Sequence, residues 1–144
     1  MDAFFGYGDD RRSFLADAEE RDWQLLRRYM TERRYPDGAV VLAPGDADRA
    51  LLLVVRGALV SGTGARAVTF EAGTVLGELA FLRGQAAGEQ VRATSDAEVL
   101  RLELARFEEL SAADPALGRY LLFDLARLLA ERNAELRAMV RRSR

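Results

Sequence analysis

Hydrophobic residues recur at two different spacings along the chain, and the changes between them divide it into three parts. From residue 9 to about residue 31, apolar residues recur at helical spacing between charged ones, which predicts an N-terminal helix. Between residues 36 and 104 the apolar runs are three to seven residues long and punctuated by glycine, a pattern typical of a β-barrel or jelly roll. Beyond residue 104 the spacing is helical again. The apolar positions of the first helix are Phe14, Leu15, Ala18, Trp23, Leu25, Leu26 and Met30.

Turn signals define the individual strands. Pro36-Asp37-Gly38 and Pro44-Gly45-Asp46 combine a proline that presets the first turn angle with a glycine that accepts a positive φ. Residues 51–55 form an apolar run that predicts a buried strand, and residues 62–64 predict a tight hairpin. We expect strands at 39–42, 51–55, 58–60, 68–70, 74–75, 90–93 and 98–104.

Two helices are predicted after the strands, a short one at 104–110 and a long amphipathic one from Pro115 to about residue 141. Residues 115–125 are expected to pack on the barrel. The distal part of a helix of this length outruns a small barrel, at 1.5 Å rise per residue, and is expected to meet a partner helix. The residues assigned to this dimer helix, at heptad spacing, are Leu125, Leu129, Arg132, Leu136 and Met139.

Composition excludes several kinds of chemistry. The 144 residues include no cysteine and no histidine, which removes disulfides, thiolate and imidazole metal sites, and Ser-His-Asp catalysis. A formal charge of −2 provides no basic field for nucleic acid. No apolar run approaches the ~20 residues that span a bilayer, and the N-terminus has acids where a secretory signal has bases. We expect a cytoplasmic protein that neither inserts into a membrane nor binds nucleic acid directly.

The segment 74–82 carries the candidate binding chemistry. Gly77 lets a ligand approach the backbone closely, and the free amides at the start of a helix attract anions. The Glu78 carboxylate can accept hydrogen bonds from sugar hydroxyls, and the alternative is that it only caps the turn. These groups are the parts of a site for a phosphate and a ribose.

This segment is similar to the phosphate-binding cassette of the cyclic-nucleotide-binding domain family. The similarity rests on Gly77-Glu78-Leu79-Ala80, followed after a loop by Val91-Arg92-Ala93, and extends over about residues 13–140. It implies a mainly β fold with flanking helices, a double-stranded β-helix or jelly-roll barrel with a long C-terminal helix. We expect one domain over residues 1–144, with a helical lead at 1–35, the barrel at 36–104 and the C-terminal helices at 105–144.

The resemblance also implies roles for the cassette residues. In the family, the glutamate holds the ribose hydroxyl, the glycine and the backbone amides approach the ribose and phosphate, and an arginine binds the cyclic phosphate. Gly77 and Glu78 match the first part, and Leu79 and Ala80 would supply amides. The arginine position falls on Ala87, or on Gly88 if the loop is gapped differently, and neither can grip a phosphate.

The loop that follows the cassette is therefore unfavourable for an anion. Glu89 adds a negative charge, and Gln90 is neutral. Losing one side of a buried charge-assisted pair costs ~2–5 kcal/mol. Arg83 and Arg92 are the nearby replacements for the phosphate ligand, although we favour reading both as solvated surface arginines.

These features predict a regulatory or sensory domain, not an enzyme, with weak or no binding of cAMP and cGMP. It would act by homodimerisation through the C-terminal helix or by contact with a partner protein. The alternative is a true small-molecule or cyclic-nucleotide sensor that uses Glu78 with Arg83 or Arg92. No cofactor is expected beyond a cyclic nucleotide as candidate ligand. No helix-turn-helix follows the long helix, so the chain is either a stand-alone protein or a domain of a larger parent protein.

Overall fold

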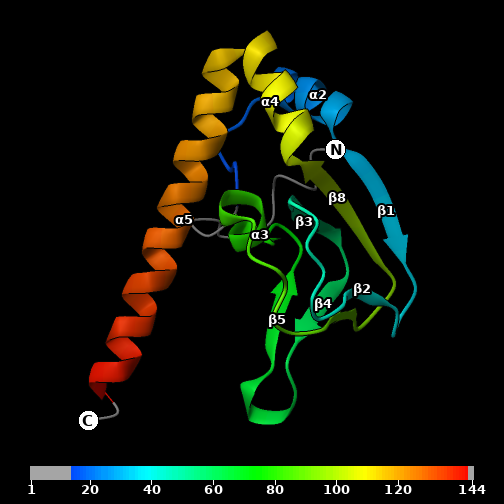
Figure 1. Ribbon diagram of the computed structural model, residues 1–144, viewed down its shortest axis with the longest axis vertical. Helices are drawn as coiled ribbons and strands as arrows, with labels where there is room; N and C mark the ends of the chain where they lie inside the picture. The colour runs from blue at the N-terminus through cyan, green and yellow to red at the C-terminus, as the bar shows by residue number, and fades with distance from the viewer. Residues whose placement is uncertain (1–13, 143–144) are drawn as a thin grey trace.

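A computed structural model describes residues 14–142 of the chain. Figure 1 shows the strands below two short helices, α2 and α4, with the long helix α5 running down one side of the molecule. The elements follow in the order α2 (Glu20–Tyr29), β1 (Thr31–Tyr35), β2 (Val40–Leu42), β3 (Ala50–Arg56), β4 (Ala58–Ser61), the 3₁₀ turn η2 (Gly64–Arg66), β5 (Val68–Glu71), β6 (Val75–Leu76), α3 (Glu78–Arg83), β7 (Val91–Ala93), β8 (Ala97–Glu103), α4 (Leu104–Ala113) and α5 (Pro115–Arg142).

The first described helix, α2, is shorter than the sequence pattern predicts. It begins after Glu19, whose backbone N–H donates to the Asp22 carboxylate at 3.0 Å, and it buries Trp23 and Leu26. Residue 31, expected at the end of this helix, instead begins β1. The predicted helical positions 9–13 lie outside the described residues.

The strands form two four-stranded antiparallel sheets. Their orders are β1-β8-β3-β6 and β2-β7-β4-β5, as expected for a jelly roll. The sheets are not closed into a barrel, since neither order returns to its first strand. The prediction of a jelly-roll arrangement with flanking helices is therefore confirmed, and closure of the barrel is not part of the structure.

The apolar run in β3 is explained by burial on both of its faces. Leu51 and Leu53 belong to the core cluster beneath the helices. Leu52 and Val54 belong to a second cluster, which lies with residues of β4 and β7. Successive side chains of a strand point to opposite faces, so a strand covered on both sides needs apolar residues throughout.

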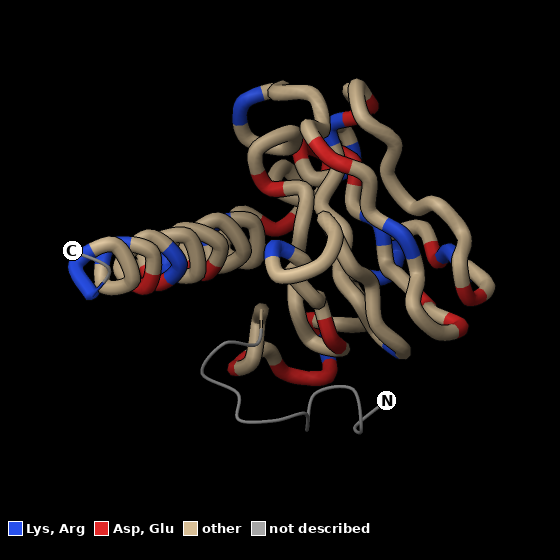
Figure 2. Tube along the Cα trace, turned by 90° about the horizontal axis from the view of Figure 1, so that it is seen from below, with Lys and Arg blue, Asp and Glu red and all other residues tan. Residues whose placement is uncertain are grey.

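The long helix α5 begins at a sharp turn after α4. The Asp114 carboxylate accepts a hydrogen bond from the backbone N–H of Leu117 at 3.1 Å, which caps the new helix. One stripe of α5 is buried in the core, formed by Leu117, Leu121, Leu125 and Leu128. Figure 2 shows that the helix then leaves the body of the molecule and ends in arginines. No described helix is long and apolar enough to cross a membrane.

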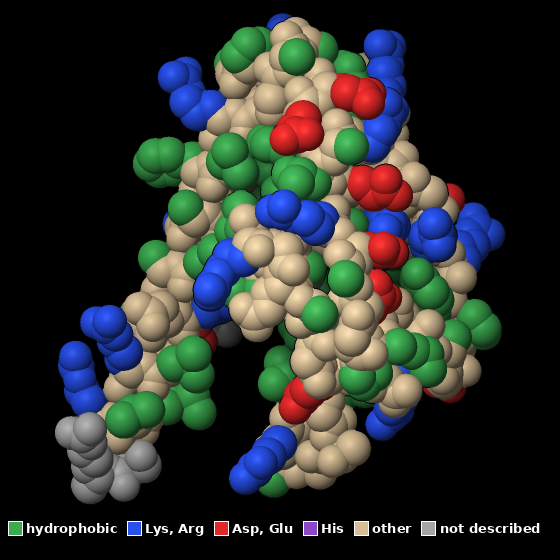
Figure 3. All heavy atoms as spheres, viewed as in Figure 1, with side chains coloured by type: hydrophobic (Ala, Val, Ile, Leu, Met, Phe, Trp, Pro, Cys, Tyr) green, Lys and Arg blue, Asp and Glu red, His purple; other side chains and the backbone are tan. Residues whose placement is uncertain are grey.

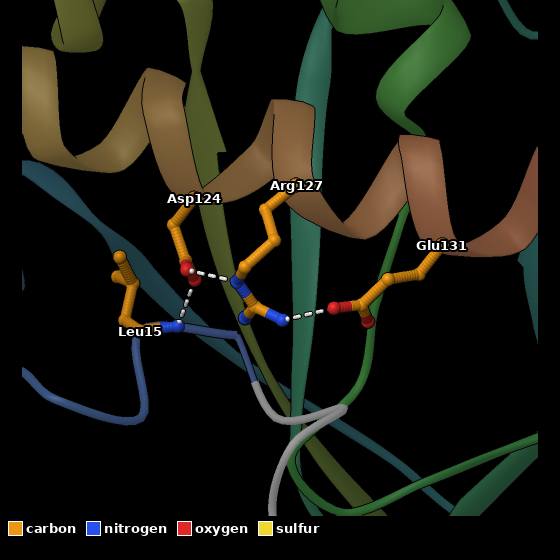
Figure 4. A network of polar contacts seen from close by, with 4 residues as sticks. All are labelled: Leu15, Asp124, Arg127 and Glu131. Carbon is orange, nitrogen blue, oxygen red and sulfur yellow. Dashed lines mark hydrogen bonds and ion pairs between the residues drawn. The ribbon is translucent and has the colours of Figure 1, made fainter.

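A polar network ties the chain before α2 to the middle of α5 (Figure 4). The Asp124 carboxylate accepts hydrogen bonds from the Leu15 backbone N–H at 2.6 Å and from Arg127 at 2.9 Å. Arg127 also donates to Glu131 at 2.8 Å. The hydrogen bond to Asp124, together with the one to Glu131, raises the pKa of Arg127, so the guanidinium stays charged. This network holds α5 against the N-terminal segment.

Candidate functional site

The candidate site is built where β6 turns into the short helix α3. Gly77 lies between these two elements with φ of 87°. A Cβ at this position would lie 2.7 Å from the Ala50 carbonyl oxygen, so the turn requires glycine for both its conformation and its close packing. Glu78 is the first residue of α3, and it lines the same cavity as Ala50 at the start of β3.

Arg49 holds the other end of α3. Its guanidinium donates to the carbonyl oxygens of Ala80, Phe81 and Leu82 at 3.2, 3.0 and 3.1 Å. A cation at this position pairs with the negative end of the helix. Arg49 was not predicted as a site residue. Its hydrogen-bond partners lie 31 to 33 residues away, and the local sequence around an arginine before an apolar strand does not indicate them.

Backbone hydrogen bonds fix the loop that follows α3. The Ala87 N–H donates to the Asp46 carbonyl at 2.8 Å, and the Gly45 N–H donates to the Ala87 carbonyl at 2.8 Å. Ala87, one of the two positions expected for a phosphate-binding arginine, is therefore held against the turn after β2. Nearby, the Ser61 hydroxyl donates to the Glu89 carboxylate at 3.1 Å.

These elements surround a cavity of about 420 Å³, a volume within the range of small-molecule sites. Most of the predicted site residues line it, and Arg83, Gln90 and Arg92 do not. In β7, Val91 is buried and lines the cavity while Arg92 is exposed, as alternation along a strand requires. The predicted residues in the lining are Gly77, Glu78, Leu79, Ala80, Ala87, Gly88 and Glu89, and the apolar floor adds Leu42, Phe70, Leu76, Val91 and Leu129.

The charged residues of the lining are mainly acidic. The described lining contains four acidic residues, Asp46, Asp48, Glu78 and Glu89, and one basic residue, Arg132. Arg101 pairs with Asp48 at 3.2 Å, and Arg132 pairs with Glu78. Among the described lining residues, the loop after α3 contributes no arginine or lysine.

Arg132, which the sequence predicts on the dimer helix, lies on α5, lines the cavity and contacts its own chain. Its guanidinium donates to the Glu78 carboxylate and, at 2.8 Å, to the Val75 carbonyl oxygen. Leu125, assigned to the same face, is only 1% exposed because it belongs to the chain's own core. The heptad pattern did not distinguish these inward positions from outward ones. Leu129 is half-buried and lines the cavity.

The distal part of α5 is the exposed one. Leu136 is 60% exposed and Met139 is 57% exposed. Both line a groove of about 410 Å³ between α5 and β5, which is visible in Figure 3 beside the lower half of the helix. Arg132 lines this groove as well as the first cavity, so it stands between the two.

Comparisons with known proteins agree with the fold described above. The family model of the cyclic nucleotide-binding domain matches residues 32–114. A cyclic nucleotide-binding domain from Methylobacillus flagellatus is 23% identical with a TM-score of 0.77, and the alignment covers 90% of this chain and 76% of that one. The catabolite activator protein of Thermus thermophilus is 26% identical with a TM-score of 0.69, over 85% of this chain and 60% of that one.

A third solved structure, the N-terminal domain of a transcriptional regulator from Streptomyces coelicolor, is 20% identical with a TM-score of 0.70. Its alignment covers 85% of this chain and 90% of that one. The chain thus spans less than two thirds of the Thermus thermophilus protein and most of the isolated domain. Comparison with curated proteins gives no match.

Proposed function

This chain belongs to the cyclic nucleotide-binding domain family, and from that premise we propose that it is a regulatory domain that binds cAMP and cGMP weakly or not at all. The observation that carries the proposal is the alanine at position 87, on a loop that lines the cavity. By sequence resemblance the family's phosphate-binding arginine is expected at this position or at Gly88, and backbone hydrogen bonds tie Ala87 to residues 45 and 46.

The charges of the cavity support the same conclusion. A cyclic phosphate would enter beside the carboxylates of Asp46 and Glu89, and Arg132, the one arginine among the described lining residues, is already paired with Glu78. Loss of one partner of a buried, hydrogen-bonded charge pair costs about 2–5 kcal/mol, which is roughly one and a half to four decades in affinity.

Titration calorimetry of the purified domain with cAMP and with cGMP tests the proposal. We expect dissociation constants far above the micromolar range, or no detectable heat of binding. A submicromolar dissociation constant for either nucleotide would contradict the proposal of weak binding. The fold of each sample is checked by far-ultraviolet circular dichroism, so that an unfolded preparation is not mistaken for a non-binding one.

We propose that the output of the domain passes through the distal part of α5, by contact with a second copy or with a partner protein. The support is the exposure of Leu136 and Met139 on a helix that extends beyond the strands. For a dimer, light scattering should report about twice 16.0 kDa, and Leu136→Glu should return the monomer. Ala134→Glu, at an exposed position on another side of the helix, is the matched control. A monomeric wild type at high concentration would leave contact with a different protein as the output.

A sensor for another small molecule is the second candidate, and the size of the cavity together with Glu78 in its lining favours it. Arg83 and Arg92 give this candidate little support as phosphate ligands, because neither lines the cavity. A ligand of this kind would raise the melting temperature of the wild type and not that of Glu78→Ala. We propose no catalytic activity for the domain, and its expected location in the cytoplasm rests on the sequence.

A further inference from the structure

The acidic residues that line the first cavity fall into two pairs with different partners. In the first pair, Glu78 forms an ion pair with Arg132, and Asp48 forms one with an arginine of β8 at 3.2 Å. The second pair consists of Asp46 and Glu89, and neither forms an ion pair with a described residue. The second pair therefore gives the lining a formal negative charge that no described arginine compensates.

Hydrogen bonds within the protein hold both of these acids beside the cavity. The Asp46 carboxylate accepts from the Asp48 backbone N–H at 3.3 Å, and the Glu89 carboxylate accepts from the Ser61 hydroxyl at 3.1 Å. The Ala87 N–H donates to the Asp46 carbonyl oxygen at 2.8 Å, which ties the two loops together. Each carboxylate uses one oxygen in these contacts, and no described donor reaches its second oxygen. The second oxygen can accept a hydrogen bond from a ligand.

The interior of the cavity is apolar. Leu76 and Val91 in the lining are 4% and 5% exposed, and Phe70 is half-buried. Contact with such side chains removes the surface of an apolar ligand from water, which is favourable. Glu89 is exposed and Asp46 is half-buried, so the uncompensated acids lie nearer the solvent than Leu76 and Val91. The cavity thus combines an apolar interior with an acidic entrance.

An ammonium group complements this entrance, whereas a phosphate meets like charges there. The ammonium carries a positive charge and three donors, and a carboxylate only accepts. Hydrogen bonds between such charged partners are roughly twice as strong as neutral ones. We propose that the cavity binds a small organic cation, an amine on an apolar body. This inference rests on the proposed function, in its form as a sensor for another small molecule, and it names the class of ligand.

Three probes that share an indole body and differ in charge test the proposal. Tryptamine carries an ammonium group, tryptophol a neutral hydroxyl, and indole-3-acetate a carboxylate. In titration calorimetry of the whole chain at neutral pH and low ionic strength, tryptamine should bind about tenfold more tightly than tryptophol. Indole-3-acetate should not bind detectably. Added salt should weaken the binding of tryptamine and leave that of tryptophol unchanged, because ions screen exposed charges. No detectable binding of tryptamine, or equal affinities for tryptamine and tryptophol, overturns the proposal.

Two variants and one matched control locate the effect. Asp46→Asn and Glu89→Gln each remove a negative charge and keep the size of the side chain. Each should weaken tryptamine binding about threefold, and the double variant should bind tryptamine no better than tryptophol. Glu108→Gln removes the same charge at an exposed position of α4, outside the cavity lining, and should leave both affinities unchanged. Unchanged tryptamine binding in the double variant, or an equal loss in Glu108→Gln, overturns the assignment of the site.

The outcomes also separate this inference from the proposed function. Tight binding of cAMP or cGMP contradicts the proposed function, whatever the affinity for tryptamine. Weak or absent binding of both nucleotides, together with absent binding of tryptamine, leaves the proposed function standing and overturns the cation site. The melting temperature and the far-ultraviolet circular dichroism of each variant show that it is folded, so that a loss of binding is assigned to the charge.

Discussion

The backbone N–H of Leu15 donates to the Asp124 carboxylate across 109 positions of the chain, at 2.6 Å (Figure 4). The carboxylate also accepts from Arg127 at 2.9 Å and is 11% exposed. One side chain of α5 thus satisfies a backbone donor of the segment that leads into α2. This contact explains how the N-terminal segment is held although its helix is short.

Asp124→Ala should therefore lower the free energy of unfolding by about 1–3 kcal/mol, because it leaves a partly buried donor without its acceptor. Urea denaturation followed by circular dichroism measures the change. Glu108→Ala, at an exposed position of α4, is the control and should change stability by less than about 0.5 kcal/mol. Equal stability of Asp124→Ala and the wild type would contradict this role.

The close approach of α4 and α5 predicts a strong effect at Gly118. A Cβ on this glycine would lie 2.9 Å from the Cβ of Ser111 and closer still to its hydroxyl. Gly118→Ala should destabilise the domain by about 1–3 kcal/mol, although alanine is the better helix former. Adding Ser111→Gly should recover part of the loss, because it removes both clashing atoms. The two single variants and the double variant, compared by urea denaturation, show whether the effects are coupled.

Arg49 should contribute to stability through the end of α3. Arg49→Met removes three hydrogen bonds to carbonyl oxygens and keeps an apolar stem. We expect a loss of about 1–3 kcal/mol in the free energy of unfolding, with faster hydrogen exchange in residues 78–84. Arg66→Met, on the exposed turn η2, is the matched control. A loss no larger than that of the control would show that the cap is unimportant.

The missing phosphate ligand can be supplied. Ala87→Arg places a guanidinium on the loop that lines the cavity, and it should raise the affinity for cAMP by at least roughly thirtyfold, equivalent to about 2 kcal/mol. Gln90→Arg adds the same charge to the same loop at a position outside the lining. Calorimetry that shows equal gains for both variants would mean that the net charge, and not the position, decides.

The alkaline limb of the stability curve should depend on Tyr120. Burial, followed by the nearby carboxylates of Asp124 and Asp17, raises the pKa of Tyr120 from 10.0 to about 12. In the unfolded chain this phenol ionises near pH 10, whereas in the folded protein it stays neutral to higher pH. The stability it contributes is therefore present below about pH 10 and is lost as the pH rises towards 12. Melting temperatures measured between these values should fall less steeply in Tyr120→Phe than in the wild type.

Much of the fold could be predicted because its signals are local. The apolar run of β3 and the proline at the start of α5 both mark elements that the structure contains. β1 was missed because its five residues, Thr31–Tyr35, are mostly charged and exposed and show no alternation of apolar and polar positions. An edge strand of this kind owes its conformation to pairing with β8, which a local pattern does not contain.

The site residues that could be predicted are likewise those with a local sequence signal. Gly77 and Glu78 could be identified because the turn and the first helical residue are adjacent in the sequence. Arg132 and Arg49 could not, because each acts through a partner more than 30 positions away. On the helix, an arginine within an apolar stripe has the same pattern whether it meets a partner helix or its own chain's carboxylate. Only the contact between Arg132 and Glu78 in the folded chain separates these two cases.

The helix α5 extends well beyond the contact between Arg132 and Glu78. The helix continues to Arg142, which at 1.5 Å per residue is an arm of about 15 Å. Residues 133–142 line neither the first cavity nor the core cluster. Substitutions in this arm therefore change the surface of the helix without changing the candidate site.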